Sequence, residues 1–114
     1  MIGVSNAAHD VLSERRRQIE HEGFTPERDD KYDRGSLAKA AACYAYAASV
    51  PDARRTQILK RKVRSAMGLA VLYELWPWSW KWWKPTSRRA DLVKAGALII
   101  AEIERIDRER VRDQ

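Results

Sequence analysis

Residues 76–85 read WPWSWKWWKP and contain all five tryptophans of this 114-residue chain. Pro77 and Pro85 prevent a continuous α-helix across the stretch, because proline lacks a backbone N–H and disfavours helix in the residue before it. In an extended conformation successive side chains point to opposite sides, so the tryptophans at 76, 78, 80 and 82 are expected on one side. The stretch therefore predicts an extended loop, rich in tryptophan and proline, before the last helix.

Helical patterns precede this loop. Ser5 or Asn6 can cap a first helix that ends at Gly23, because Ser and Asn accept bonds from free N–H groups and glycine favours the C-terminal position. A polar loop over 24–35 follows, with Phe24 as its anchor. Ser36 is expected to cap an alanine-rich second helix, whose small side chains allow close packing against another helix. A third helix is predicted from about residue 53 to 75.

The last helix is predicted to begin after Thr86 or Ser87 and to fray over residues 109–114. Six of its apolar residues recur at helical spacing, which favours a stripe facing the core. These are Leu92, Val93, Leu98, Ile99, Ile103 and Ile106. Since no segment alternates polar and apolar residues as a paired strand would, the chain is predicted to be all-α: one domain, residues 1–114, forming a bundle of about four helices.

The charge distribution, the short apolar runs and the single cysteine narrow the classes of protein and partner. The net charge is +6, but six cations and no acid lie between residues 53 and 64, and the rest of the chain is balanced. One basic patch does not favour a nucleic acid as partner, since nucleic-acid binding uses a broad basic face. Apolar runs are too short to span a membrane, and the single cysteine, Cys43, excludes an internal disulfide. A cytoplasmic protein is expected, and its small size favours a homo-oligomer.

The tryptophan loop is the first candidate site. Indole faces next to cations suit a ligand with a base and a phosphate, because bases stack on aromatic rings and guanidinium groups bind phosphate strongly. The same indoles also suit an extension of the core, and different tryptophans can serve the two purposes. The candidate ligand-binding residues are Trp78, Trp80, Lys81, Trp82, Trp83, Lys84, Arg88 and Arg89, with Arg15 and Arg16 as contributors from another helix.

Carboxylates form the second candidate site, and a solvated loop surface is the simpler interpretation of them. Glu104 and Asp107 share one helix face and match the ExxD pattern of MazG-type nucleotide pyrophosphohydrolases, although the expected ExxE on an earlier helix is absent. If such an enzyme were present, Mg²⁺ would be its cofactor; otherwise no cofactor is expected. The candidate metal ligands of this alternative are Glu22, Asp29, Asp30, Glu104 and Asp107.

Three stretches together resemble a family of small, mostly uncharacterised phage and prophage proteins. They are ERRRQIEHEGFTPERDD (14–30), GSLAKAAACYA (35–45) and WPWSWKWWKPTSRRADLVKAGALIIAEIERIDR (76–108). Residues 46–75 depart from the family pattern, which identifies them as a variable insertion. The resemblance implies a phage origin and expression in the cytoplasm of a bacterial host.

The resemblance also suggests a role, since small phage proteins without an evident active site often counter host defence. The leading hypothesis is a non-enzymatic protein that sequesters a nucleotide or nucleotide-derived immune signal in a Trp/Lys/Arg pocket. The alternatives are the degenerate MazG-like hydrolase and an inhibitor that binds a host defence protein, as anti-CRISPR proteins do.

Overall fold

The computed structural model describes residues 3–31, 35–59 and 70–112, and these contain helices and no strand. The all-α prediction is therefore confirmed. The elements in chain order are α1 (Asn6–His21), α2 (Pro26–Asp29), α3 (Ser36–Ser49), α4 (Asp52–Leu59), α5 (Ala70–Leu75), the 3₁₀-helix η2 (Trp80–Trp82) and α6 (Arg88–Arg112). None of the described helices is long and apolar enough to cross a membrane.

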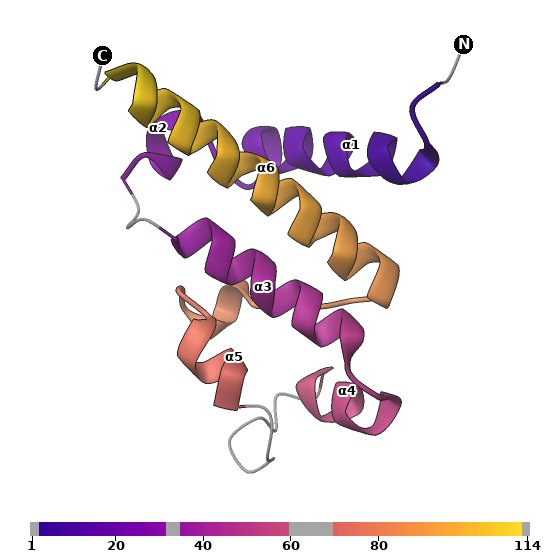
Figure 1. Cartoon of the computed structure of the whole chain (residues 1–114). Coiled ribbons are helices and arrows are strands. Elements are labelled where there is room, and N and C mark those ends of the chain that lie inside the picture. Colours follow the sequence, from indigo (N-terminus) through magenta and orange to yellow (C-terminus); the bar gives the residue numbers. More distant parts are fainter. Residues whose placement is uncertain (1–2, 32–34, 60–69, 113–114) are drawn as a thin grey trace.

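The centre of the fold is an antiparallel pair, α3 and α6, which lie side by side in Figure 1. Small residues of both helices belong to one buried cluster: Ala40 and Ala47 of α3, and Ala95 and Ala101 of α6. Small side chains let two helix axes approach closely. The close packing that the alanine-rich sequence predicts is thus confirmed, and it allows long side chains at the edges of the pair to reach across to the partner helix.

Helix α1 crosses behind α6 in Figure 1 and packs against it. Its predicted bounds are confirmed: the Ser5 hydroxyl accepts a hydrogen bond from the Ala8 N–H at 3.1 Å, and Gly23 follows the helix with a positive φ of 74°. At the crossing, a Cβ on Gly96 would lie 3.1 Å from both methyl groups of Val11. Glycine at this position permits the close approach of the two helices.

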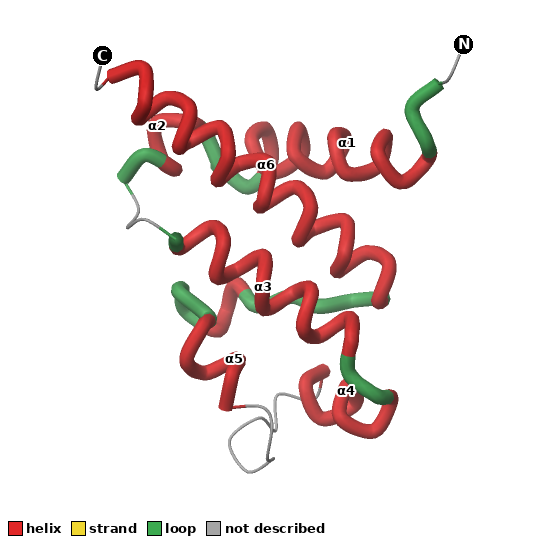
Figure 2. Tube along the Cα trace, in the orientation of Figure 1, coloured by secondary structure: helices red, strands yellow, loops and turns green. Residues whose placement is uncertain are grey.

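Three boundaries differ from the prediction (Figure 2). The polar loop after Phe24 contains the short helix α2, because Thr25 caps it by accepting from the Arg28 N–H at 3.3 Å. Gly35, with φ 95°, takes the cap position expected of Ser36. Helix α6 continues through Arg112 instead of fraying at residue 109.

The predicted helix over 53–75 is described only at its ends, as α4 and α5, and residues 60–69 lie outside the described chain. The axes of α4 and α5 are not in line in Figure 1, and both pack against α3. Arg55, expected on a solvated basic face, is buried. Its guanidinium donates to the Ala47 and Thr86 carbonyls and to the Asp91 carboxylate at 2.7–2.8 Å, joining α4 to α3 and α6.

The predicted core stripe of α6 is largely wrong. Leu98 is buried, but four of the six residues are 41–52% exposed: Leu92, Ile99, Ile103 and Ile106. The alanine faces of α6 pack against α3 in their place, because alanine allows the closer contact. Polar residues at the edges are buried by pairing, as Asp91 is with Arg55.

Candidate ligand-binding groove

The tryptophan segment is bent, not extended. Ser79 accepts from the Lys81 N–H at 3.5 Å and begins the single turn η2. In a 3₁₀ turn residues three apart lie on one side, so Trp80 and Trp83 face the same cluster with ring centroids 6.3 Å apart. The prediction that Trp82 lies with the even-numbered tryptophans is therefore wrong, since this turn directs Trp82 away.

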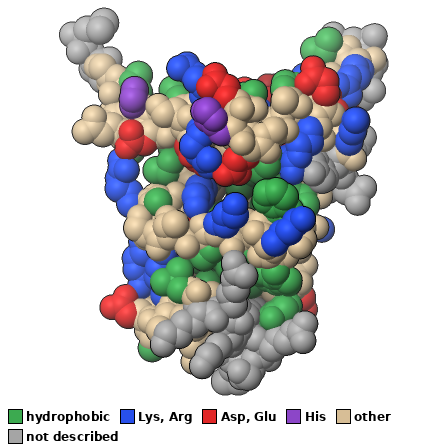
Figure 3. All heavy atoms as spheres, turned by 180° about the vertical axis from the view of Figure 1, so that it is seen from behind, with side chains coloured by type: hydrophobic (Ala, Val, Ile, Leu, Met, Phe, Trp, Pro, Cys, Tyr) green, Lys and Arg blue, Asp and Glu red, His purple; other side chains and the backbone are tan. Residues whose placement is uncertain are grey.

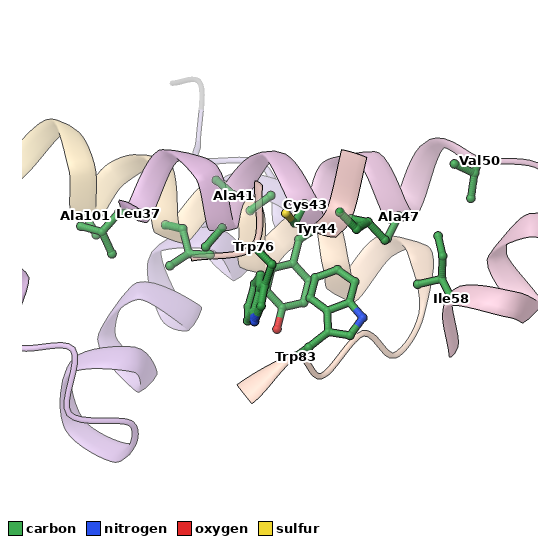
Figure 4. Close-up of a cluster of buried hydrophobic side chains, with 14 residues drawn as sticks. Leu37, Ala41, Cys43, Tyr44, Ala47, Val50, Ile58, Trp76, Trp83 and Ala101 are labelled. Carbon is green, nitrogen blue, oxygen red and sulfur yellow. The ribbon is translucent and has the colours of Figure 1, made fainter. Parts of the chain in front are cut away.

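Trp76 is at the centre of the aromatic cluster. Its ring centroid lies 5.5 Å from Trp78, 6.0 Å from Trp80 and 4.9 Å from Trp83. Tyr44 of α3 packs against Trp76 and Trp83, and Figure 4 shows the three rings together under α3. The expectation that some indoles extend the core is confirmed for Trp76 and Trp83, which are 7% and 2% exposed.

Tyr44 also fixes the backbone of the segment. Its hydroxyl accepts from the Lys84 N–H at 3.1 Å and donates to the Trp82 carbonyl at 3.4 Å. Burial raises the pKa of Tyr44 to about 12, so the hydroxyl keeps its proton at neutral pH. Trp82 is thereby held at the surface, where its side chain is 51% exposed and both Lys81 and Lys84 place their ammonium groups over its ring.

A pocket lies between α1 and the tryptophan segment. Its enclosed volume is about 60 Å³, enough for a few water molecules and less than the roughly 300–1,000 Å³ of typical ligand sites. A larger ligand requires lining side chains to move, and Trp82 and Lys84 are exposed members of the lining. The lining residues come from α1, α2, α3, α6 and the loops: Glu14, Arg17, Gln18, Glu22, Phe24, Arg28, Tyr44, Trp76, Trp78, Trp82, Lys84, Lys94 and Leu98.

Gln18 is the most informative residue of this pocket. The side chain is 2% exposed, and its Nε2 makes a long bond of 3.5 Å to the Glu14 carboxylate. Its Oε1 is buried and has no hydrogen-bond partner among the described residues. A buried polar atom without a partner costs free energy, about 1–3 kcal/mol. The amide therefore offers an unused hydrogen-bonding group to whatever enters the pocket.

A second, more open hollow adjoins the first and has a volume of about 340 Å³. The two share Glu14, Arg17 and Lys94 and so form one groove. In Figure 3 basic and acidic side chains surround a hollow on this face, with hydrophobic side chains beside it. Arg89 and Ser13 extend the second hollow along α6 and α1. The groove thus joins an aromatic half to a half with three cationic side chains.

The cations of the groove differ in how firmly they are held. Arg17 bonds Glu14 and Glu22 at 2.7–2.8 Å, and the bond with Glu14 is the main reason that its pKa is raised. Lys94 donates to the Lys84 carbonyl at 2.6 Å, which leaves two of its ammonium hydrogens. Arg89 pairs with the exposed Asp10 and lowers the pKa of that carboxyl. Exposed pairs of this kind are weak, so Arg89 can exchange Asp10 for a ligand.

The predicted ligand-binding residues are only partly brought together. Trp78, Trp82 and Lys84 line the aromatic half and Arg89 lines the basic half. The other predicted residues do not line either half: Trp80, Lys81, Trp83, Arg88, Arg15 and Arg16. Arg88 donates to the Ala48 and Val50 carbonyls at 2.7–2.8 Å. This arginine holds the start of α6 against the end of α3.

Arg15 is also structural. Its buried guanidinium donates to Glu104 at 2.9 Å and to the Phe24 carbonyl at 3.2 Å, and it pairs with Asp29 at 3.5 Å. Desolvation raises the pKa of Asp29, against the opposing charge of Arg15. Two candidate metal ligands, Asp29 and Glu104, therefore gather around an arginine.

Glu22 and Asp30, two further candidate metal ligands, are held by other arginines. Glu22 pairs with Arg17, and Asp30 pairs with Arg108 and Arg112. The bond from Arg108 is the main reason that the pKa of Asp30 is lowered. Within the described part of the chain, no group of three or more His, Cys, Asp or Glu residues is placed to hold a metal ion.

Gln18, Glu14 and Lys94 were not among the site residues predicted from the sequence. Glu14 and Gln18 are four residues apart and so share a face of α1, which was a usable signal. That face also carries Val11 and Arg15, and such a mixture of apolar and charged residues is typical of an ordinary helix surface. Comparisons with models of known protein families, with curated proteins and with solved structures found no match for this chain.

Proposed function

We propose that the protein binds a small ligand that carries a planar base and a phosphate, a nucleotide or a nucleotide-derived signal, in the groove between α1 and the tryptophan segment. The side-chain oxygen of Gln18 carries this proposal, because it lies buried without a hydrogen-bond partner in a pocket lined by indoles. Bases offer ring faces for stacking and edge groups for hydrogen bonding. Such a ligand would place its base beside Trp78 and Gln18 and its phosphate near Arg89 and Lys94.

The biological role that fits this binding is sequestration. The resemblance to small phage proteins suggests a stoichiometric trap for a nucleotide immune signal, released into a bacterial cytoplasm. A trap needs tight, reversible binding and no chemical step, so intact ligand should be recovered from the complex.

The test is a titration of the full chain with nucleoside mono-, di- and triphosphates and cyclic nucleotides, followed by tryptophan fluorescence and calorimetry. A stacked base should quench the indoles saturably. Gln18→Leu should weaken the binding about 2- to 12-fold, the factor that corresponds to one hydrogen bond of about 0.5–1.5 kcal/mol. Gln57→Leu, a change at an exposed glutamine of α4, is the matched control and should bind as the unchanged protein does.

Chemical denaturation of Gln18→Leu separates binding from structure. Because one end of the amide has no partner, leucine should keep or raise the free energy of unfolding. A marked loss of stability would show that Gln18 is a structural residue. The proposal fails if no nucleotide gives saturable binding, or if Gln18→Leu binds unchanged. Recovery of a cleaved nucleotide would replace sequestration by hydrolysis.

A further inference from the structure

Three polar side chains of the aromatic half of the groove follow one line along α1. Glu14, Gln18 and Glu22 succeed one another at intervals of four residues, so they share one face of the helix and its C-terminal cap. All three line the pocket that Trp76 and Trp78 also line. Carboxylate and amide oxygens therefore give this side of the pocket a row of hydrogen-bond acceptors.

The orientation of the Gln18 amide is set by its neighbour. Its Nε2 donates to the Glu14 carboxylate at 3.5 Å, whereas the reverse orientation would place Oε1 against that carboxylate and bring two acceptors together. The Phe24 N–H donates to the Gln18 backbone carbonyl at 2.8 Å, which holds this end of α1 in place. The buried atom without a partner among the described residues is thus an acceptor, Oε1. A ligand that satisfies it must bring an N–H or O–H donor.

The Glu14 carboxylate is a second acceptor beside Gln18. Arg17 donates to its two oxygens at 2.7 and 2.8 Å. An ionised carboxylate has about four lone-pair sites, so these bonds and the one from Gln18 leave room for a further donor. The pocket therefore presents two neighbouring acceptors to a ligand, the Gln18 Oε1 and the Glu14 carboxylate.

The charge of the pocket separates two kinds of donor. Both an ammonium group and a neutral ring N–H can donate, but an excess of two positive charges in the lining disfavours a cationic ligand. The charged lining residues are Arg17, Arg28, Lys84 and Lys94 against Glu14 and Glu22. A neutral base that carries its negative charge on a phosphate suits both the acceptors and the excess positive charge.

We propose that the groove selects guanine nucleotides, an inference that rests on the nucleotide binding proposed above. Proteins read an unstacked base by hydrogen bonds to its Watson–Crick edge. On that edge guanine has two adjacent donors, N1–H and the N2 amino group, which match the two acceptors at Gln18 and Glu14. Adenine, cytosine and uracil each place a donor next to an acceptor, and that acceptor would lie against an oxygen of the pocket.

Adenine is the base that a glutamine commonly recognises, by accepting at Oε1 and donating from Nε2 together. In this pocket Nε2 is directed at the Glu14 carboxylate. The adenine N1, which accepts, would then face that carboxylate without a donor between them. Glu14 therefore turns the preference of the amide from adenine to guanine.

Arg28 suits the remaining group of the guanine edge. The central carbon of its guanidinium lies 4.1 Å from the Phe24 ring centroid and 5.5 Å from that of Trp78, so it is beside the ring against which the base is placed. The guanine O6 is an acceptor next to N1–H, and a guanidinium N–H can donate to it. Guanine thus meets a donor as well as two acceptors.

Calorimetric titration of the full chain with the monophosphates of guanosine, inosine and adenosine tests the selectivity. The three ligands share the purine ring system, the ribose and the phosphate. The inosine ligand lacks only the N2 amino group, and the adenosine ligand changes N1 from a donor to an acceptor. Guanosine monophosphate should bind about 5- to 150-fold more tightly than adenosine monophosphate, the factor expected of one well-formed set of base contacts. Inosine monophosphate should lie between them.

Two variants test the assigned residues. Gln18→Leu removes the buried acceptor, and Glu14→Gln replaces the carboxylate with an amide of the same shape that can donate to the adenine N1. Each should lower the ratio of guanine to adenine affinity by about 2-fold or more, as the loss of one hydrogen bond predicts. Gln57→Leu, at the exposed glutamine of α4, should leave the ratio unchanged. A general loss of stability affects both ligands alike and does not alter the ratio.

The outcomes separate this inference from the proposed function. Equal or tighter binding of adenosine monophosphate, or binding of other nucleotides but not of the guanosine ligand, would overturn the selectivity while nucleotide binding stands. A guanine preference that persists in both variants would overturn the roles of Gln18 and Glu14. Failure of every nucleotide to bind would overturn the selectivity and the proposed function together.

Discussion

Asp91 and Asp52 provide a test of what holds α4, α3 and α6 together. Each carboxylate accepts a hydrogen bond from one arginine at 2.6–2.7 Å, but the Asp91 side chain is fully buried and that of Asp52 is 99% exposed. Asp91 also accepts from the Thr86 N–H at 2.8 Å. The two pairs thus share chemistry and distance and differ in burial.

Asp91→Ala should lower the free energy of unfolding by about 3–5 kcal/mol, because it leaves the guanidinium of Arg55 buried without its counter-charge. Arg55 would keep its bonds to the Ala47 and Thr86 carbonyls, which places the loss within that range. A chain of 114 residues has a total stability of about 6–17 kcal/mol. The variant should therefore be folded but close to its limit.

Urea denaturation followed by circular dichroism measures the loss. With a slope of about 1–3 kcal/mol per molar urea, a loss of 4 kcal/mol moves the midpoint by roughly 1.3–4 M. Asp52→Ala, the exposed control, should cost less than about 1 kcal/mol. Equal costs for the two variants would refute the reasoning, since burial would then have no part in the strength of the pair.

Three further outcomes are expected. Trp83→Ala should lower the free energy of unfolding by about 3–5 kcal/mol, because the indole is 2% exposed. Trp82→Ala, at an exposed indole, should lower it by less than about 1 kcal/mol. Equal urea midpoints for the two variants would contradict the burial of Trp83. Burial raises the pKa of the Cys43 thiol to about 12, so a thiol reagent at pH 8 should label the native protein far more slowly than the protein in urea; fast native labelling would contradict it. Burial raises the pKa of Tyr44 from 10.0 to about 12, so the free energy of unfolding should hold below pH 10 and fall by about 2–3 kcal/mol as the pH rises to 12, because the unfolded chain loses this proton first. Tyr44→Phe should lose less stability over this interval. Identical pH profiles for the two proteins would show that the pKa of Tyr44 is not raised.

Local signals predicted the fold well where they act within a few residues. The Ser5 cap and Gly23 define α1 in both the sequence and the structure. The side of α6 that is buried depends instead on α3. Alanine and isoleucine both suit a core, and the approach of the alanine-rich α3 decides that Ala95 and Ala101 are buried while Ile99 and Ile103 are exposed. The spacing of apolar residues in the sequence therefore does not predict which side of α6 is buried.

The tryptophan segment shows a second limit. Alternation predicts four indoles on one side only if the backbone stays extended, and Ser79 is a small polar residue that can cap a turn. That turn exchanges Trp82 for Trp83 in the buried cluster. The sequence therefore predicts an aromatic site at this place, but which ring is exposed depends on a single turn, in which the Trp82 N–H donates to the Ser79 carbonyl and the Trp83 N–H to the Trp80 carbonyl.

The same segment serves the core and the groove, and this determines which variants are informative. Trp76 touches three other indoles and also lines the pocket, so its removal would lower stability and binding together. A loss of binding in a tryptophan variant therefore does not separate the two roles. Gln18 separates them, because its side-chain oxygen has no hydrogen-bond partner among the described residues and is therefore available to a ligand. If Gln18→Leu weakens ligand binding but keeps the free energy of unfolding, the ligand must bind in the groove.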